Sequence, residues 1–329
     1  MFHYDGGLKI TAIDLAVDFR RRQPRGFISH AHSDHMARHE LAICTPETAA
    51  LYRKRFGPRP TRDLPHGQTL DWDGIELSTH PAGHVLGSAM LLVEGGGERL
   101  LYTGDFKLGP SATAAEAQPP RADILVMEST FGDPRYRLPP RDEVVAELLA
   151  IVERALADGR TPVIQAYVLG KAQEVTKILA DRGHRIEQHR LVQEITDVYE
   201  ACGCRVGSAG VCTAQPPAGT VIVAPPRWQK GAALPRLERP VTIAVTGWAS
   251  DPRWRLRHGV DYAVPLSDHA DYDDLIECIG RVQPRVVYCT HGPEEFVGRL
   301  QKLGHHALPL AACRAGARPS LERVQGSLF

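Results

Sequence analysis

Four potential metal ligands stand close together in the run His30-Ala-His32-Ser-Asp34-His35, directly after the apolar segment Gly26–Ser29. Zinc takes imidazole nitrogen and carboxylate oxygen as ligands, and a tight turn with alternating ligands can serve two adjacent ions. Although the chain holds 15 histidines, chance assembly of this pattern is improbable. The run therefore predicts a metal centre at the end of a strand. The competing interpretation is a set of surface histidines that cap a helix beginning near Asp34.

The same arrangement recurs along the chain wherever an apolar segment ends in a histidine or an acid. Alone, each such residue is more often a hydrogen-bonded structural residue than a ligand. In a chain that already holds four ligands, these positions favour a shared site, because strands of one sheet can gather their carboxyl ends along one edge. The residues concerned are His84, Asp105, Glu128, His269 and His291.

Short apolar segments of strand length, each bounded by glycine, proline or charge, predict a chain rich in β-strands. The tripeptide Gly95-Gly96-Gly97 lies between two of them and is typical of a hairpin turn rather than a phosphate-binding loop, because no helical pattern follows it. The segments are Gly26–Ser29, Ile75–Thr79, Ala89–Val93, Arg99–Thr103, Ile124–Met127, Val163–Ala166, Val221–Ala224, Thr242–Val245, Tyr262–Val264 and Val286–Cys289.

Helical periodicity is clearest at Arg141–Asp158, Lys171–Arg182 and Asp271–Val282. In the first part of the chain the strands follow one another as hairpins, whereas strand and helix alternate from Val163 onward, as they do in α/β layers. We therefore expect a β-rich core at residues 1–133 and 262–329, with an α/β domain inserted at residues 134–261.

Lysine plus arginine equals aspartate plus glutamate, 39 of each, so the formal net charge is zero. This balance argues against a protein that coats nucleic acid through bulk charge, but it allows a local basic groove. Basic residues do cluster, at Arg20–Arg22, Arg53–Arg55 and Arg253–Arg257. Each cluster is either a solvated surface or, beside a hydrolytic site, an electrostatic track for a polyanion.

The seven cysteines are scattered and odd in number, so no disulfide framework is expected. The pair Cys202-Gly-Cys204 lacks the usual spacing of a metal or redox site, and we interpret both residues as structural thiols. Because we find neither a signal peptide nor an apolar stretch of about 18 residues, we expect a globular cytoplasmic protein that does not associate with membranes.

The ligand-bearing segments resemble the signature motifs of the metallo-β-lactamase superfamily, and specifically of its nucleic-acid-processing β-CASP branch. The resemblance extends over nearly the whole chain, in order, and its motifs are specific when taken together. It implies an α/β fold, an αββα metallo-β-lactamase sandwich with an inserted β-CASP cap domain. The matching segments are His30–His35, Gly83–Ser88, Thr103–Phe106, Glu128–Gly132, Ser267–Asp271 and Thr290–Gly292.

The resemblance also implies a centre of two divalent ions, zinc or alternatively manganese, that activates water for hydrolysis. Asp14 resembles the family's early structural aspartate, which is not a ligand. The expected ligands are His30, His32 and His84 for one ion, Asp34, His35 and His291 for the other, and Asp105 as a bridge between both.

Three residues are expected to take part in catalysis. Asp34 would orient the attacking hydroxide, His269 would supply the leaving oxygen with a proton, and Glu128 would hold the imidazole of His269 in place. Three more are candidates for substrate binding. Ser129 lies in a matching motif, Lys171 lies at the start of a helix that suits a phosphate, and Trp248 is either a base-stacking platform or a buried anchor.

Taken whole, the chain most resembles the bacterial ligase-associated DNA exonucleases of this branch. This implies a zinc-dependent nuclease that processes DNA ends in repair, with a DNA ligase and a helicase as partners. RNA is the alternative substrate, because DNA-specific eukaryotic members tend to have valine where His291 stands. A hydrolase of small thioesters or lactams, or a non-catalytic binding protein, is disfavoured because the inserted domain and every expected ligand are present.

Overall fold

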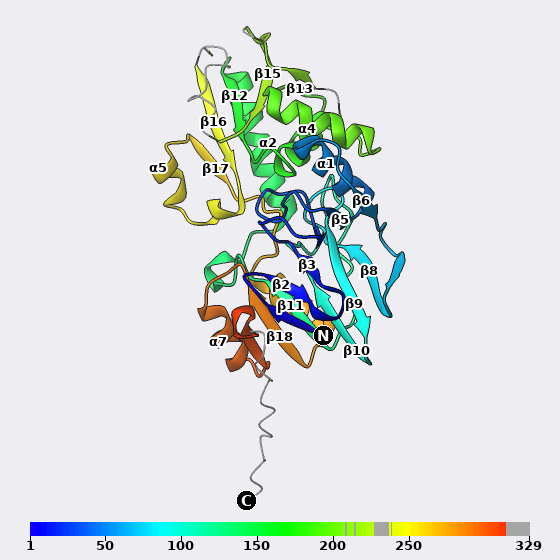
Figure 1. The fold of residues 1–329 in the computed structure, drawn as a ribbon. Helices are drawn as coiled ribbons and strands as arrows, with labels where there is room; N and C mark the ends of the chain where they lie inside the picture. The colour runs from blue at the N-terminus through cyan, green and yellow to red at the C-terminus, as the bar shows by residue number, and fades with distance from the viewer. Residues whose placement is uncertain (208, 214, 227–236, 238, 314–329) are drawn as a thin grey trace, which may run out of the picture.

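The computed structural model describes residues 1–207, 209–213, 215–226, 237 and 239–313, which form a core and a cap (Figure 1). The core is an αββα sandwich of two sheets, and the cap is an α/β domain inserted between two neighbouring core strands. This is the fold class that the sequence predicts. The last part of the predicted core, residues 314–329, lies outside the described residues.

Sheet A contains the N-terminal strands in chain order. Its first three strands pair antiparallel, and the pairing is parallel from β3 to β6. The strands are β1 (Phe2–Tyr4), β2 (Leu8–Ile10), β3 (Leu15–Val17), β4 (Arg25–Phe27), β5 (Leu41–Cys44) and β6 (Thr61–Asp63).

Sheet B has the order β19-β18-β11-β10-β9-β8-β7. Antiparallel hairpins join β7 to β10, whereas β10, β11, β18 and β19 run parallel. The strands are β7 (Thr69–Trp72), β8 (Ile75–Pro81), β9 (Ala89–Gly95), β10 (Glu98–Tyr102), β11 (Ile124–Glu128), β18 (Val286–Thr290) and β19 (Ala307–Pro309).

The central strands of sheet B are buried on both faces. In β9, Leu91 and Val93 pack against sheet A, whereas Met90 and Leu92 face the helices on the outer side. Side chains alternate across a strand, so a strand covered on both faces is apolar throughout. This double burial explains why the sequence shows continuous apolar segments here rather than an alternation of apolar and polar residues.

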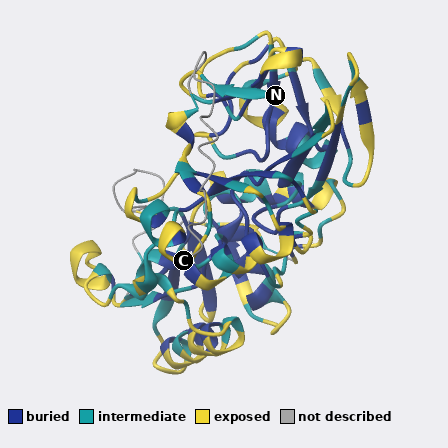
Figure 2. Cartoon of the chain, turned by 90° about the horizontal axis from the view of Figure 1, so that it is seen from below, coloured by how far each residue is buried: buried dark blue, intermediate teal, exposed yellow. Residues whose placement is uncertain are grey.

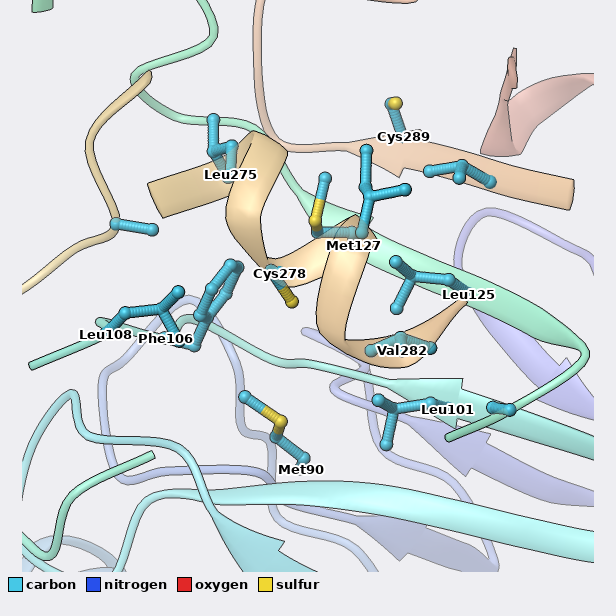
Figure 3. Close-up of a cluster of buried hydrophobic side chains, with 14 of the residues drawn as sticks. Met90, Leu101, Phe106, Leu108, Leu125, Met127, Leu275, Cys278, Val282 and Cys289 are labelled. Atoms are coloured by element: carbon cyan, nitrogen blue, oxygen red, sulfur yellow. The ribbon is translucent and has the colours of Figure 1, made fainter. Parts of the chain in front are cut away.

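Helices α6 (Tyr272–Val282) and α7 (Glu295–Lys302) cover the outer face of sheet B. The carboxylate of Asp271 caps α6 by accepting a hydrogen bond of 2.9 Å from the backbone N–H of Asp274. Figure 3 shows α6 side chains next to those of the sheet, among them Leu275 and Cys278 near Met127. The apolar residues of α6 recur at three- and four-residue intervals, which places them on one face of the helix.

Helix α1 (Pro46–Phe56) covers the outer face of sheet A, and α4 (Arg190–Ala201) of the cap packs on the same cluster. Tyr199 of α4 is fully buried there, and its hydroxyl accepts a hydrogen bond from the backbone N–H of Leu86 in the core. The cap and the core therefore share an apolar cluster close to the segment that holds His84.

The cap is built on sheet C, in which every strand pair is parallel and the order is β14-β13-β15-β12-β16-β17. Helices α2 (Arg141–Ala157) and α3 (Lys171–Ala180) cover one face of it. Figure 2 shows the buried strands inside both domains and the exposed residues on helices and loops around them. The strands are β12 (Thr161–Gln165), β13 (Arg185–Gln188), β14 (Gly210–Val211), β15 (Thr220–Ala224), β16 (Pro240–Val245) and β17 (Tyr262–Val264).

All ten predicted strands are present, as are the three predicted helices and the hairpin turn after Gly95. One assignment changes. The strand Tyr262–Val264, expected to open the second core segment, pairs with β16 in the cap sheet, so we place the return to the core after Val264. Helices α1, α4 and α7 have no counterpart in the sequence-based prediction.

All seven cysteines are free thiols, as the sequence predicts. Among the described residues, none of the helices combines the length and the apolar character that a membrane span requires.

Candidate metal centre and its cavity

The predicted ligands converge where the two core sheets meet beneath the cap. Asp105 and His291 follow the parallel strands β10 and β18, which flank β11 in sheet B, but the run that begins at His30 follows β4 of sheet A. His269 follows β17 of the cap sheet. The expectation that one sheet gathers all these residues is therefore wrong, because the site is assembled from the ends of strands in three sheets.

The first ligand group contains three imidazoles and a carboxylate, and their ligand atoms lie within 4.8 Å of one another. The Nδ1 atom of His32 is 3.1 Å from Nε2 of His30 and 3.0 Å from Nε2 of His84. Nitrogens bound tetrahedrally to one zinc ion lie roughly 3.3 Å apart, so this spacing fits a shared ion. An Oδ2 atom of Asp105 completes the group, at 3.6 Å from Nε2 of His30.

The second group shares Asp105. Its Oδ2 atom is 3.2 Å from Nε2 of His35, and its Oδ1 atom is 3.9 Å from Nδ1 of His291. His291 has a φ angle of 53°, a left-handed conformation that is uncommon for a residue other than glycine. Such backbone strain is concentrated at functional sites, and here it accompanies the turn that follows β18.

Asp34 is the predicted ligand that the structure leaves outside both groups. Its Oδ2 atom is 3.9 Å from Nε2 of His35, and it also faces the guanidinium of Arg20 at 3.7 Å. About half of the Asp34 side chain is exposed, whereas His35 is buried. Its roles as ligand and as the residue that orients the attacking hydroxide stay predictions.

Hydrogen bonds to the outer nitrogens decide which way the histidines of the run and His84 present their lone pairs. His32 donates from Nε2 to the carbonyl of Leu169 at 3.1 Å, and His84 donates from Nδ1 to the carbonyl of Asp268 at 2.7 Å. A proton fixed on the outer nitrogen leaves the inner nitrogen unprotonated in the neutral ring, as a metal requires. Leu169 belongs to the cap, so a cap carbonyl orients a core ligand.

The protonation states of the first group fit the same purpose. Burial lowers the pKa values of His30 and His32 below the usual range, and it lowers that of His84 to about 3, with the neighbouring imidazoles adding to the effect. Neutral imidazole is the form that binds metal. Burial by itself raises the pKa of Asp105, but contact with His35 outweighs it and holds that pKa well below the usual value. The carboxylate is thus ionised, and the donor set fits divalent cations.

The buried Glu128 and the partly buried His269 form a pair beside the two groups. Nδ1 of His269 donates to the carboxylate of Glu128, at 3.0 Å from Oε1 and 3.1 Å from Oε2. The carboxylate also accepts from the backbone N–H of Phe106 and the hydroxyl of Thr130. Burial lowers the pKa of His269, but the charge of Glu128 outweighs it and raises that pKa to about 10. His269 therefore carries a proton on the nitrogen that faces away from Glu128.

A cavity of about 690 Å³ opens above these residues, between core and cap. Asp105, His269 and His291 line it, and so do two arginines, Arg20 and Arg55. The remaining wall includes three aromatic side chains, Phe131, Tyr167 and Trp248.

The sequence leaves open whether Trp248 is a base-stacking platform or a buried anchor, and the structure shows features of both. Its ring packs edge-on against Phe131, with centroids 4.7 Å apart, and against Tyr136 at 5.3 Å. It is nevertheless only partly buried and lines the cavity, which leaves it available for stacking.

The chain is similar in sequence to several known proteins. Residues 255–309 match the family described as "Zn-dependent metallo-hydrolase RNA specificity domain". A probable DNA ligase of Opitutus terrae is 38% identical over 92% of this chain and 30% of its own length. The 5′ exonuclease Apollo of Gallus gallus is 28% identical over 92% of this chain and 68% of its own length. These similarities and the motifs of the chain indicate the β-CASP nuclease branch of the metallo-β-lactamase superfamily.

A solved structure of a protein of unknown function from Enterococcus faecalis V583 has the same fold. It superimposes with a TM-score of 0.58 over 81% of this chain and 75% of its own length, at 15% sequence identity. This β-CASP chain spans less than a third of the DNA ligase relative. The family membership implies divalent metal ions, in agreement with the two ligand groups that share Asp105.

The structural aspartate of this β-CASP protein is Asp18, not Asp14. Asp14 is two-thirds exposed and pairs with Lys9 at the surface. Asp18 accepts a hydrogen bond of 2.9 Å from Nδ1 of His35 and further ones from Ser29 and Tyr102. The sequence did carry a signal for it, since Asp18 directly follows the apolar strand β3 in the same way as the other site residues follow their strands.

Two of the three substrate-binding candidates are not exposed to the cavity. Ser129 is 1% exposed, and its N–H and hydroxyl both donate to the carbonyl of Thr290, which ties the ends of β11 and β18 together. Lys171 is also 1% exposed, and its ammonium lies 3.0 Å from Glu174 and 3.9 Å from Asp268. Both side chains therefore support the site in this structure and do not contact a substrate in its cavity.

We predict that Asp18→Asn weakens metal binding roughly tenfold to a hundredfold, because His35 loses the carboxylate that orients its ring. Asp14→Asn, a matched change four residues away, should leave the affinity unchanged. Competition with a chromophoric chelator measures both variants. Equal affinity in the two variants would contradict the assignment of Asp18.

For Lys171→Met we predict a loss of about 3 kcal/mol in the free energy of unfolding, because the buried carboxylates of Glu174 and Asp268 lose the ammonium between them and only Glu174 keeps another cation, Arg141. The matched variant Lys177→Met, on the same helix, removes a surface pair with Asp181 and should cost less than about 1 kcal/mol. Urea denaturation measures both. If the Lys171 variant is as stable as the parent but binds an oligonucleotide more weakly, the result would instead support a direct contact between Lys171 and the substrate.

Proposed function

We propose that this β-CASP protein is a nuclease that hydrolyses phosphodiester bonds with two zinc ions. The observation that carries the proposal is the pair of ligand groups joined by Asp105 on the floor of a cavity with a cationic rim. Manganese is the alternative metal that the family resemblance implies. The same core could serve a hydrolase of small thioesters or lactams, but such an enzyme has no use for the cap or for the Glu128–His269 pair.

His30, His32, His84 and Asp105 would hold one ion, and His35, His291 and Asp105 the other, with Asp34 next to the second. When bound, a pair of divalent ions supplies a hydroxide nucleophile at neutral pH and neutralises charge on the phosphate oxygens. The protein positions these ligands through the hydrogen bonds to their outer nitrogens, so little reorganisation is needed when a phosphate enters.

His269 acts on the leaving group. Its Nδ1 atom is engaged by Glu128, and its other ring nitrogen carries the proton that the departing oxygen requires. Glu128 is itself held by Phe106 and Thr130, so the imidazole keeps one orientation. Glu128 is therefore a positioning residue, and His269 is the catalytic acid.

The shape and charge of the cavity favour a nucleic-acid strand. Arg20 and Arg55 supply positive charge for a phosphate backbone, and Tyr167 and Trp248 offer aromatic faces for bases. Arg20 already pairs with Asp34, so an incoming phosphate competes with this carboxylate for the guanidinium. Trp248 keeps its proposed role in substrate binding.

DNA is the favoured substrate, with exonucleolytic end processing in repair as the proposed role. The Opitutus terrae relative is named a probable DNA ligase and the Gallus gallus relative a 5′ exonuclease, and each aligns with 92% of this chain. A DNA ligase is the proposed partner on the same ground, and a helicase is proposed from family resemblance alone. RNA is the second candidate substrate. Residues 255–309 match a family whose description includes RNA specificity. His291 stands in a ligand group, at the position where DNA-specific eukaryotic members tend to have valine.

We predict that His269→Ala retains both metal ions but lowers kcat by about 10²- to 10⁴-fold, because the leaving oxygen loses its proton donor. Metal content by mass spectrometry and turnover on a labelled oligonucleotide test this together. His306→Ala, an exposed histidine of the core, is the control and should behave as the parent protein. Near-normal turnover with full metal content in the His269 variant would refute the catalytic role.

The nuclease activity itself is tested on end-labelled single strands of DNA and RNA of identical sequence, each with and without a 5′-phosphate. We expect cleavage of DNA to be faster, to release products from one end, and to stop with a chelator and resume with zinc. Faster cleavage of RNA would favour the second candidate. Failure to cleave either strand with zinc or manganese restored would count against a nuclease.

A further inference from the structure

A second cavity, of about 580 Å³, lies in the cap. It adjoins the cavity above the two ligand groups, which we call the catalytic cavity. The two share Tyr167 and Thr246 as lining residues, so they form one continuous surface. The second cavity contains none of the ligands or catalytic residues described above. Its other lining residues are Gln165, Pro226, Thr242, Ala244, Val245, Trp254, Arg257, His258 and Gly259.

The position of this cavity in the fold is one that commonly binds ligands. Gln165 is the last residue of β12 and Val245 the last of β16, and the two strands are parallel neighbours in sheet C. In open α/β sheets, ligands bind in the crevice outside the carboxyl ends of the strands. The second cavity therefore lies at the binding edge of the cap sheet, next to the catalytic cavity.

Aromatic side chains face the cavity from two sides. Trp254 of α5 (Trp254–His258) stacks on His258, with centroids 3.8 Å apart and ring planes inclined by 13°. Tyr167 is 52% exposed, which is high for a large aromatic side chain. A stacked pair of rings and an exposed tyrosine that line one cavity can accept a flat heteroaromatic group by stacking.

The charge of this region suits a phosphate attached to such a group. Arg253, Arg255 and Arg257 are all exposed, and only Arg257 forms an ion pair among the described residues, with Asp251. Of the basic cluster that the sequence shows at 253–257, Arg257 lines this aromatic cavity. It has no part in the metal centre.

We infer that the second cavity is a nucleotide subsite, which stacks one base of the strand whose scissile phosphate lies in the catalytic cavity. The inference rests on the proposed nuclease function and extends it to a second recognition element. The base stacks between Tyr167 and the Trp254–His258 pair, and Arg257 faces a backbone phosphate. The strand crosses from one cavity to the other over Tyr167 and Thr246.

The test compares a single-stranded oligonucleotide of roughly ten nucleotides with bis(p-nitrophenyl) phosphate, which is too short to reach the subsite. For zinc-loaded Trp254→Ala we expect KM for the oligonucleotide to rise about fivefold to thirtyfold, with kcat changed less than twofold. Trp254→Phe should recover most of the loss, because a phenyl ring still stacks. Arg257→Ala should raise KM more at low salt than at high salt.

Arg190→Ala is the matched control, since this exposed cap arginine forms a surface pair with Glu194 on α4 and should change neither constant. Turnover of bis(p-nitrophenyl) phosphate by the Trp254 variants should equal that of the parent, which also shows that they are folded. An unchanged oligonucleotide KM in Trp254→Ala, with the parent protein active, would overturn the subsite alone. A parent protein inactive on both substrates would overturn the nuclease function, and the subsite with it.

Discussion

The carboxylate of Asp105 is the group on which the site depends. It is buried where two sheets meet, and a buried carboxylate without positive partners is strongly unfavourable. His30, His35 and His84 surround one of its oxygens at 3.2 to 4.0 Å, and His291 lies 3.9 Å from the other. Because a single carboxylate belongs to both ligand groups, the two proposed ions would be coupled through it. Any change that moves β10 relative to β4 or β18 would disturb both groups together.

The cap contributes to this centre as well as covering it. The carbonyl of Leu169 in the cap orients His32, and the carbonyl of Asp268 orients His84. Asp268 in turn faces the buried ammonium of Lys171, which begins the cap helix α3. A displacement of the cap would therefore release His32 from the hydrogen bond that fixes its ring, and it would remove Lys171 from Asp268, whose carbonyl holds His84. The cavity proposed to bind a strand lies along the same boundary, so strand binding and organisation of the proposed metal ligands would involve the same contacts between domains.

Much of the fold follows from local patterns. The central strands of sheet B are mostly apolar because α6 and sheet A cover their two faces, and such segments are recognisable without knowledge of their partners. Helix α1 was missed although Thr45 and Pro46 form a typical start, because its exposed Arg53–Arg55 end hides the buried positions. The short strand β17 was assigned to the wrong domain, since three residues do not reveal which sheet they join.

The sequence alone determined the chemistry of the centre, because closely spaced ligands such as His30, His32 and His35 are held together by the covalent chain whatever the rest of the fold does. Only the tertiary structure decided between Asp14 and Asp18, which follow apolar residues in the same way but face solvent in one case and His35 in the other. It also decided that Lys171 is a buried partner of Glu174 and not a free cation. Burial and pairing depend on residues that are distant in the chain, so a local sequence pattern does not reveal which side chains are buried or paired.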